Sequence, residues 1–281
     1  MAFLILFSSI ILSTIAYAAE NELVWTGERS IYYGGIVGAA EEFTKKTGIK
    51  VTTIPGGCST AAKGVKSGKV DVGGLCCKPK EEELKAGYKA YPLAYEALVI
   101  IVNNANPITN LTVQQVRDIF SGKIKNWKEV GGQDKPIKVV TRLHCKDRED
   151  NWKQILNSPE LFTKDRKDVK EDQDVLLAVG NEPNSIAYIS LTMVNRKFAK
   201  VLSINGITPS RESLIDNTYP WKGTDYMITM GEPTGNKKKF IEFLLTDGRK
   251  FFKKDVAFVD EVKPVVAKKK GLKEKPLKKK L

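Results

Sequence analysis

Short apolar runs alternate with amphipathic stretches from residue 23 onward, a pattern typical of an α/β fold rather than of a sandwich or a helical bundle. In the first part of the chain the pattern predicts strands at residues 23–25, 50–54 and 70–72, and helices at residues 36–47 and 59–67. Gly48 and Gly68 follow the two helices and end them. Glycine-rich turns join these strands to the helices, and open parallel sheets bind ligands at such turns, outside the carboxyl ends of the strands.

The same alternation continues through the middle of the chain. Residues 97–102 (ALVIIV) form a continuous apolar run, which is typical of a strand buried on both faces. Asn110 is the predicted N-cap of a helix over residues 110–120. The other predicted elements are strands at residues 137–141 and 186–189, and helices at residues 150–156, 175–179, 237–245 and 249–254.

The N-terminal segment, residues 1–18, reads MAFLILFSSIILSTIAYA and carries no charge. It ends in Ala16-Tyr17-Ala18, the small-residue pattern that signal peptidases accept, so we interpret it as a signal peptide. This predicts export to the periplasm or to the extracellular face of the cytoplasmic membrane. An uncleaved anchor is the alternative, because a run of about 17 apolar residues is close to the length that spans a bilayer.

The formal net charge of +13 is concentrated at the C-terminal end. Residues 263–281 contain nine lysines and one acid, Glu274, which is +8 and leaves +5 for the rest of the chain. Few apolar residues and repelling charges predict that residues 259–281 form a disordered tail. The alternative is contact with an anionic membrane surface. Nucleic acid is not a predicted partner, because no aromatic residue stands among these lysines to stack on bases.

Five stretches resemble, in order, the phosphate-type periplasmic solute-binding proteins of ABC transporters: residues 94–103, 111–132, 137–142, 184–190 and 231–235. The second stretch, which contains FSGKIKNWKEVGG, is the longest and most specific. The resemblance implies a two-lobed, type II periplasmic-binding-protein-like fold, a small inorganic ligand in the cleft between the lobes, and an ABC transporter permease as partner. It implies one lobe from residues 20–96 and 200–258 and a second from residues 97–199. No enzymatic activity is predicted, since the sequence contains no P-loop, nucleophile elbow or HExxH motif.

Four loops that hold phosphate in this family have counterparts at residues 26–30, 55–63, 71–78 and 141–150. The resemblance implies ligand contacts from Ser30, Gly57, Ser59, Thr60, Arg142 and Lys146. Carboxylates at Glu28 and Glu149 depart from the family pattern and would repel a phosphate, which puts plain phosphate binding in doubt.

All four cysteines of the chain lie in three of these loops, and the only histidine lies beside one of them. The resemblance brings these loops to one cleft, so we predict a metal or cluster site formed by Cys58, Cys76, Cys77, Cys145 and His144. Thiolates select soft ligands, so the candidate cofactors are an iron–sulfur cluster, Zn or Cu(I). The short CxxC spacing is absent, so the spacing does not name the metal.

Two alternatives stay open at this point. A permanent iron–sulfur cluster on the same fold would make the chain an electron-transfer protein. Alternatively, four cysteines in an oxidising compartment would form two disulfides, and the cleft would keep a phosphate-like oxyanion.

Overall fold

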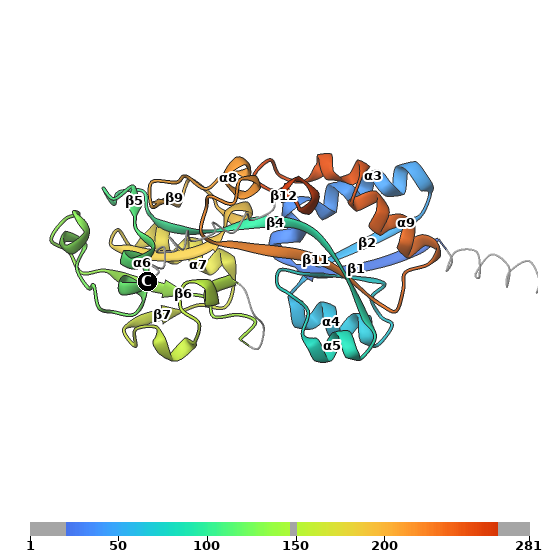
Figure 1. Cartoon of the computed structure of the whole chain (residues 1–281), viewed down its shortest axis with the longest axis horizontal. Coiled ribbons are helices and arrows are strands. Elements are labelled where there is room, and N and C mark those ends of the chain that lie inside the picture. The colour runs from blue at the N-terminus through green and yellow to red at the C-terminus, as the bar shows by residue number, and fades with distance from the viewer. Residues whose placement is uncertain (1–20, 147–150, 264–281) are drawn as a thin grey trace, which may run out of the picture.

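The computed structural model describes residues 21–146 and 151–263 (Figure 1). The predicted signal peptide, Glu149 and the lysine-rich residues 264–281 lie outside these residues. Within the described part of the chain, no helix combines the length and the apolar character needed to cross a membrane.

One lobe contains three parallel strands with helices on both sides of them (Figure 1). The strands are β1 (Glu22–Glu28), β2 (Lys50–Gly56) and β3 (Val72–Leu75). The helices are α2 (Arg29–Ile31), α3 (Val37–Thr47), α4 (Cys58–Lys66), α5 (Glu81–Lys85) and α9 (Gly235–Leu244), with a π-helical turn η1 (Tyr32–Ile36) and 3-10 turns η6 (Asp247–Phe251) and η7 (Val259–Glu261). Phe43 of α3 and Phe240 of α9 pack together in a core beside Trp25.

The other lobe is built around β6 (Lys138–Thr141), β7 (Arg166–Asp168), β8 (Ser185–Ser190) and β9 (Ala199–Val201). Its helices are α6 (Val113–Phe120), α7 (Asp172–Asn181) and α8 (Arg211–Ile215), with 3-10 turns η2 (Trp127–Val130), η3 (Asn151–Gln154), η4 (Pro159–Leu161) and η5 (Leu191–Met193). A separate two-stranded sheet pairs β5 (Asn110–Leu111) with β10 (Ser203–Ile204).

Two long strands join the lobes, β4 (Tyr88–Asn103) and β11 (Lys222–Met230) (Figure 1). They pair antiparallel along all of β11. The strand order is β2-β1-β3-β11-β4-β8-β6-β7, and β9 and the short β12 (Ala257–Phe258) also pair with β4. This mixed, two-lobed arrangement confirms the predicted fold class.

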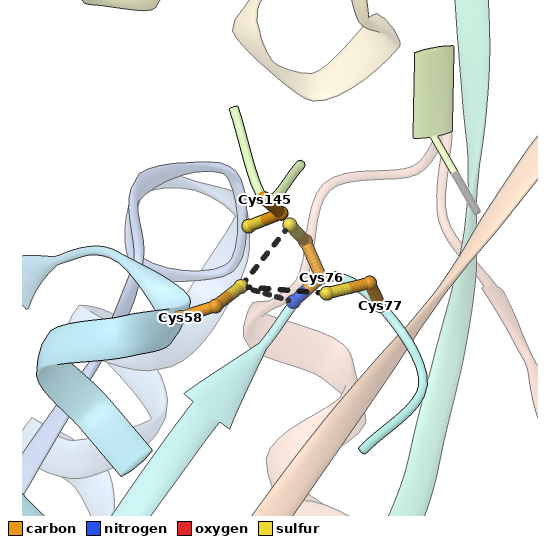
Figure 2. Close-up of side chains that lie close together, drawn as sticks. All are labelled: Cys58, Cys76, Cys77 and Cys145. Carbon is orange, nitrogen blue, oxygen red and sulfur yellow. Dashed lines mark hydrogen bonds between the residues drawn. The ribbon is translucent and has the colours of Figure 1, made fainter. Parts of the chain in front are cut away.

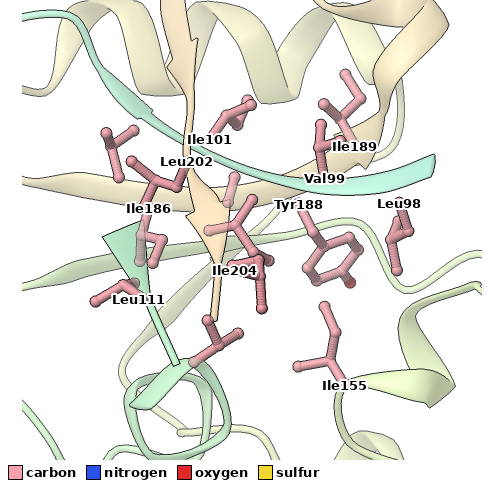
Figure 3. Close-up of a cluster of buried hydrophobic side chains, with 14 of the residues drawn as sticks. Leu98, Val99, Ile101, Leu111, Ile155, Ile186, Tyr188, Ile189, Leu202 and Ile204 are labelled. Carbon is pink, nitrogen blue, oxygen red and sulfur yellow. The ribbon is translucent and has the colours of Figure 1, made fainter. Parts of the chain in front are cut away.

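The hydrophobic half of β4 forms the core of the second lobe. Figure 3 shows Val99 and Ile101 of β4 among Ile186 and Ile189 of β8, and all four are buried. The apolar run at residues 97–102 is covered on both faces, as the sequence predicts.

The helix predicted over residues 110–120 begins later than expected. Thr112 is the N-cap, because its hydroxyl accepts a hydrogen bond from the Gln115 amide (3.1 Å) and the Gln115 side chain accepts one from the Thr112 amide (2.8 Å). This reciprocal pair is a capping box. Asn110 lies in β5, and its side chain accepts from Gly206 (2.7 Å), so its prediction as N-cap is wrong.

Two other predicted helices are only short turns. In place of helices at residues 150–156 and 249–254, the structure has the 3-10 turns η3 and η6. Strand β11 is not predicted by the apolar pattern, because its inward positions are occupied by Gly223 and Asp225 as well as Met227. A glycine and an aspartate at these positions hide the apolar alternation on which a strand prediction depends.

The segment after β9 is predicted to belong to the first lobe, which is expected to resume at residue 200. In the structure this segment packs on the second lobe. Its buried residues Leu202, Ile204, Leu214, Tyr219 and Trp221 belong to the core cluster of the second lobe. The reason is that the Leu202 amide donates to Ile100 of β4 (2.9 Å) and that β10 pairs with β5. The chain returns toward the first lobe only with β11.

The predicted disordered tail begins too early, because residues 259–263 are part of the fold. Asp260 pairs with Arg249 (2.9 Å), and Glu261 pairs with Arg211 (2.6 Å). The Lys263 amide then donates to Ile215 of α8 (3.0 Å). These contacts tie the end of the described chain to both α8 and η6.

We therefore expect two truncations to differ. Removing residues 264–281 should leave the melting temperature unchanged. Removing residues 259–281 should lower it by about 5 °C, since it also deletes the hydrogen bond to α8 and three ion pairs: Asp260–Arg249, Glu261–Arg211 and Lys263–Asp216. Thermal unfolding followed by circular dichroism measures both. An equal loss of stability in the two variants would show that residues 264–281 also pack.

Candidate functional site

The four cysteines converge at one point between the lobes. Their Sγ atoms all lie within 4.8 Å of one another, and Figure 2 shows the side chains pointing toward a common centre. The Cys58 and Cys76 Sγ atoms are 3.4 Å apart, and those of Cys58 and Cys77 are 3.8 Å apart. Cys145 is half-buried and the other three are buried. The predicted meeting of these residues in one cluster is therefore seen in the fold.

Three of the cysteines come from neighbouring ends of the first lobe. Cys58 is the first residue of α4, with Gly57 as its N-cap, and Cys76 and Cys77 follow β3 directly. The Cys76 amide points at the Cys58 sulfur at 3.4 Å. The Cys58 sulfur therefore lies at the N-terminus of α4, within reach of a backbone amide of the loop after β3.

Cys145 reaches the cluster from the second lobe, on the loop after β6. Its backbone is in the left-handed region (φ 47°), which is uncommon for a residue other than glycine. The loop is anchored by Trp152, whose buried indole donates to the carbonyl of His144 (2.6 Å). The core of the second lobe therefore fixes the backbone that presents this thiol.

Two polar side chains of the same lobe face Cys76. His144 Nε2 lies 3.9 Å from the Cys76 sulfur, and His144 Nδ1 lies 3.2 Å from the carbonyl of Arg142. Donation from Nδ1 to that carbonyl leaves Nε2 as the free lone pair toward the cluster. Burial, with a smaller effect from Arg142, lowers the pKa of His144, so the ring is neutral. Asn151 Nδ2 donates to the Cys76 carbonyl (3.0 Å) and approaches its sulfur (3.4 Å).

The thiols hold negative charge unequally. Hydrogen bonds from Cys58, Cys76 and Cys77 lower the pKa of Cys145, whereas hydrogen bonding to Cys145 raises the pKa of Cys76 and of Cys77. Hydrogen bonding among the four sulfurs therefore favours the ionised form of Cys145 over that of Cys76 or Cys77. The four sulfurs are a ready-made set of soft ligands for a cation that would replace the protons.

The distances between the sulfur atoms distinguish between the candidate cofactors, a single metal ion and an iron–sulfur cluster. Four thiolates around one tetrahedral ion, at about 2.3 Å from it, lie about 3.8 Å from one another. The observed separations of 3.4 and 3.8 Å fit that geometry, and a limit of 4.8 Å holds for all pairs. An iron–sulfur cubane needs its thiolates farther apart, because the cluster core lies between them. The cysteines are all free, so the two disulfides of the alternative interpretation are absent.

A small cavity of about 30 Å³ adjoins the cluster at Cys76. Arg142, on its wall, is buried and binds two carboxylates: Nη2 lies 3.2 Å from Glu28 and Nη1 lies 3.4 Å from Asp172. Its Nε donates to the carbonyl of Lys170 (3.0 Å). The pKa of Glu28 is raised to about 7, because burial outweighs the effect of Arg142.

A second pair of acids lies deeper in the cavity wall, on the strands that join the lobes. Glu96 of β4 and Asp225 of β11 are buried and hydrogen-bond to each other. Glu96 also accepts from Thr192 (3.2 Å) and from Ser190. Burial is the largest cause that raises the pKa of both carboxyl groups, and the charge of Glu96 raises that of Asp225 further. Burial and the closeness of the two acids therefore favour the protonated form of the pair.

The structure brings only some of the predicted ligand residues to the cavity. Ser30 and Arg142 line it, and Gly57 caps α4 beside it. In contrast, Ser59, Thr60 and Lys146 are exposed and do not line it.

Several residues that line the cavity were not predicted from the sequence, and they include Glu96, Asn151, Asp172 and Asp225. Asp172 lies in the first turn of α7, so its sequence signal is that of an ordinary helix-capping acid. Asp225 lies in β11, a strand that the apolar pattern does not predict, so no local pattern in the sequence places Asp225 in the cavity.

The comparisons with known proteins agree with this architecture. A family model described as "PBP superfamily domain" matches residues 21–248. The phosphate-binding protein PstS of Bacillus subtilis is 26% identical over 221 residues, which cover 75% of this chain and 71% of that protein. PstS of Borreliella burgdorferi is 29% identical over 175 residues, covering 58% of this chain and 63% of that protein.

Solved structures give the same picture. A Clostridium perfringens protein assigned to phosphate ABC transport, solved with bound phosphate, has a TM-score of 0.74 and 27% identity and covers 85% of this chain and 100% of that chain. A phosphate transport receptor from Vibrio cholerae has a TM-score of 0.65 at 24% identity, over 81% of this chain and 95% of that chain, and shows the shared fold.

The buried acid pair predicts a stability that depends on pH. The unfolded chain releases the Asp225 proton near pH 4, whereas the folded chain keeps this proton to a higher pH. The contribution of Asp225 to stability is therefore fully present below about pH 4 and declines as the pH rises from there toward the pKa of the folded state. Asn mimics the protonated acid. From pH 5 to pH 8, we expect Asp225→Asn to gain at least about 1 kcal/mol of stability relative to the natural chain.

Thermal unfolding of both proteins at several pH values tests this expectation. Asp255→Asn is the control, because Asp255 is exposed and should show no such trend. If Asp225→Asn instead loses stability relative to the natural chain as pH rises, Asp225 is ionised in the fold.

Proposed function

The chain belongs to the PBP superfamily domain family, and we propose that it is an extracytoplasmic solute-binding protein that captures a single soft metal ion between its lobes. One observation carries this proposal: every thiol of the chain converges on one point in the cleft, three from one lobe and one from the other. The ligands are Cys58, Cys76, Cys77 and Cys145, and His144 is a hydrogen-bonding partner of Cys76.

The chemistry of the donors supports a cation of the class of Zn(II) or Cu(I). Thiolates select soft or borderline ions over hard ones, and four of them complete a tetrahedral site. Arg142, a buried cationic group beside the cluster, is already paired with Glu28 and Asp172. A cation is therefore the ligand that suits the charge of this cleft.

The sulfur spacing favours a single ion over a permanent iron–sulfur cluster. The 3.4 and 3.8 Å separations suit ligands of one metal, so binding and release, rather than electron transfer, is the function we propose.

Export and a membrane partner complete the proposal. The relatives named above are phosphate-binding proteins, one of them described as an ABC transporter substrate-binding protein, so we propose an ABC permease as the recipient of the metal ion. The apolar residues 1–18 would direct export, and the nine lysines from residue 263 onward would hold the protein near anionic lipid.

We predict that Cys58→Ser lowers the affinity for Zn(II) by at least about 100-fold, since replacing a direct ligand should cost more than the roughly 10- to 100-fold typical of an outer partner. Ser59→Ala is the matched control, because this exposed neighbour is on the same helix and should bind Zn(II) as the natural chain does. Competition titration with a chromophoric chelator, under reducing conditions, measures both.

The same titration with Cu(I) tests the class of ion. Unchanged affinity for both ions in the Cys58→Ser variant would exclude the cysteine cluster as the metal site.

We also predict that Zn(II) compacts the protein, because the ligands come from both lobes and a bound ion would hold them together. Small-angle X-ray scattering should give a smaller radius of gyration with Zn(II) than without it. Cys145→Ser removes the only thiol of the second lobe and should abolish the compaction. Equal radii in the natural chain with and without bound Zn(II) would contradict a capture mechanism.

A further inference from the structure

The Glu28 carboxylate occupies a position with the features of an anion-binding site. It is buried at the end of β1, with only 3% of its surface exposed. One oxygen lies 3.2 Å from Arg142, and the other would lie 3.8 Å from a Cβ placed on Gly57, the N-cap of α4. A buried guanidinium and the N-terminus of a nine-residue helix are both groups that stabilise anions.

The hydrogen-bond donors of Arg142 are taken up by the chain itself. Glu28, Asp172 and the Lys170 carbonyl each bind one of the three guanidinium nitrogens. With both acids ionised, two negative charges surround one positive charge. An incoming anion would find no uncompensated positive charge in this cavity.

An independent observation indicates that a polar guest fits beside this group. Asp172 is 6% exposed, and its Oδ2 atom is buried without a hydrogen-bond partner among the described residues. Asp172 and Ser30 both line the 30 Å³ cavity next to Glu28. An oxygen that lacks a donor is suited to a guest that carries an O–H group, such as a hydrogen phosphate ion or water.

We propose that Glu28 is a built-in occupant of an oxyanion site formed by Arg142, Ser30 and the start of α4, and that it makes the cleft reject tetrahedral oxyanions. Repulsion between Glu28 and an incoming anion acts in a buried setting, where screening is weak. The side chain also fills the space that the anion needs. This inference concerns Glu28 and Arg142 and does not depend on metal binding by the cysteines.

The test is whether removal of Glu28 creates binding of inorganic phosphate. Metal-free, reduced protein is titrated with phosphate by calorimetry at pH 8, above the pKa of about 7 for Glu28. Glu28→Ser removes both the charge and the bulk and should bind phosphate at least about 100-fold more tightly than the natural chain. Glu28→Gln removes only the charge and should gain at least about tenfold. Sulfate is the second probe.

Two further variants test whether Arg142 is the group that binds the phosphate. Glu22→Ser, at the exposed end of the same strand, should bind phosphate no better than the natural chain. Adding Arg142→Met to Glu28→Ser should remove the gained affinity, since the guanidinium is the group that Glu28 covers.

Several results would overturn the inference. Tight phosphate binding by the natural chain would show that Glu28 does not block the site. A folded Glu28→Ser variant with no gain would do the same, and if that variant does not fold, absence of a gain in Glu28→Gln decides against it. Zn(II) binding is measured separately on the same variants and should still require the cysteines, which separates this result from the fate of the metal proposal.

Discussion

The pairing of β4 with β11 is the interaction on which the rest of the structure depends, because these two strands carry the chain from one lobe to the other. Their register sets Glu96 opposite Gly223 and Ala94 opposite Asp225, with an irregularity directly after Asp225. The two acids therefore meet beneath the cleft, and the loops that end β1, β3 and β6 face one another above it. The crossing brings Cys145 of the second lobe against Cys58, Cys76 and Cys77, which the first lobe itself holds together.

The cleft separates into a soft part and an acidic part. The sulfur atoms form one cluster, and Cys76 of that cluster lines the cavity together with four acids, Glu28, Glu96, Asp172 and Asp225. Buried charge of one sign is costly unless it is paired or protonated. Arg142 compensates Glu28 and Asp172, and burial raises the pKa of Asp225 beside Glu96, which favours the protonated form of that pair. Only the sulfur side is left with ligands that a bound cation would complete.

The α/β alternation, the family and the meeting of the cysteines could all be predicted from the sequence, because each leaves a local signal. The acidic side of the cleft could not. Glu28 and Arg142 are 114 residues apart, and neither residue reveals that the other neutralises it. Asp225 makes β11 harder to predict, since an acidic residue at an inward position interrupts the alternation of apolar and polar residues. The lobe boundary predicted at residue 200 differs from the structure for a similar reason. The pairing of β10 with β5 is a tertiary contact, and the periodicity of apolar residues does not predict it.

On the proposed function, the uneven division of the thiols between the lobes has a mechanistic consequence. Cys58, Cys76 and Cys77 pack in one cluster of the first lobe, so three ligands are in place before the lobes meet. Cys145 is added only by closure, which also buries Glu28 against Arg142 and so takes two charges out of water. Without a metal ion, that desolvation opposes closure; with one, the fourth thiolate offsets it. A permease that pulls the lobes apart would remove one ligand from four, and release would follow because three thiolates hold the ion less tightly.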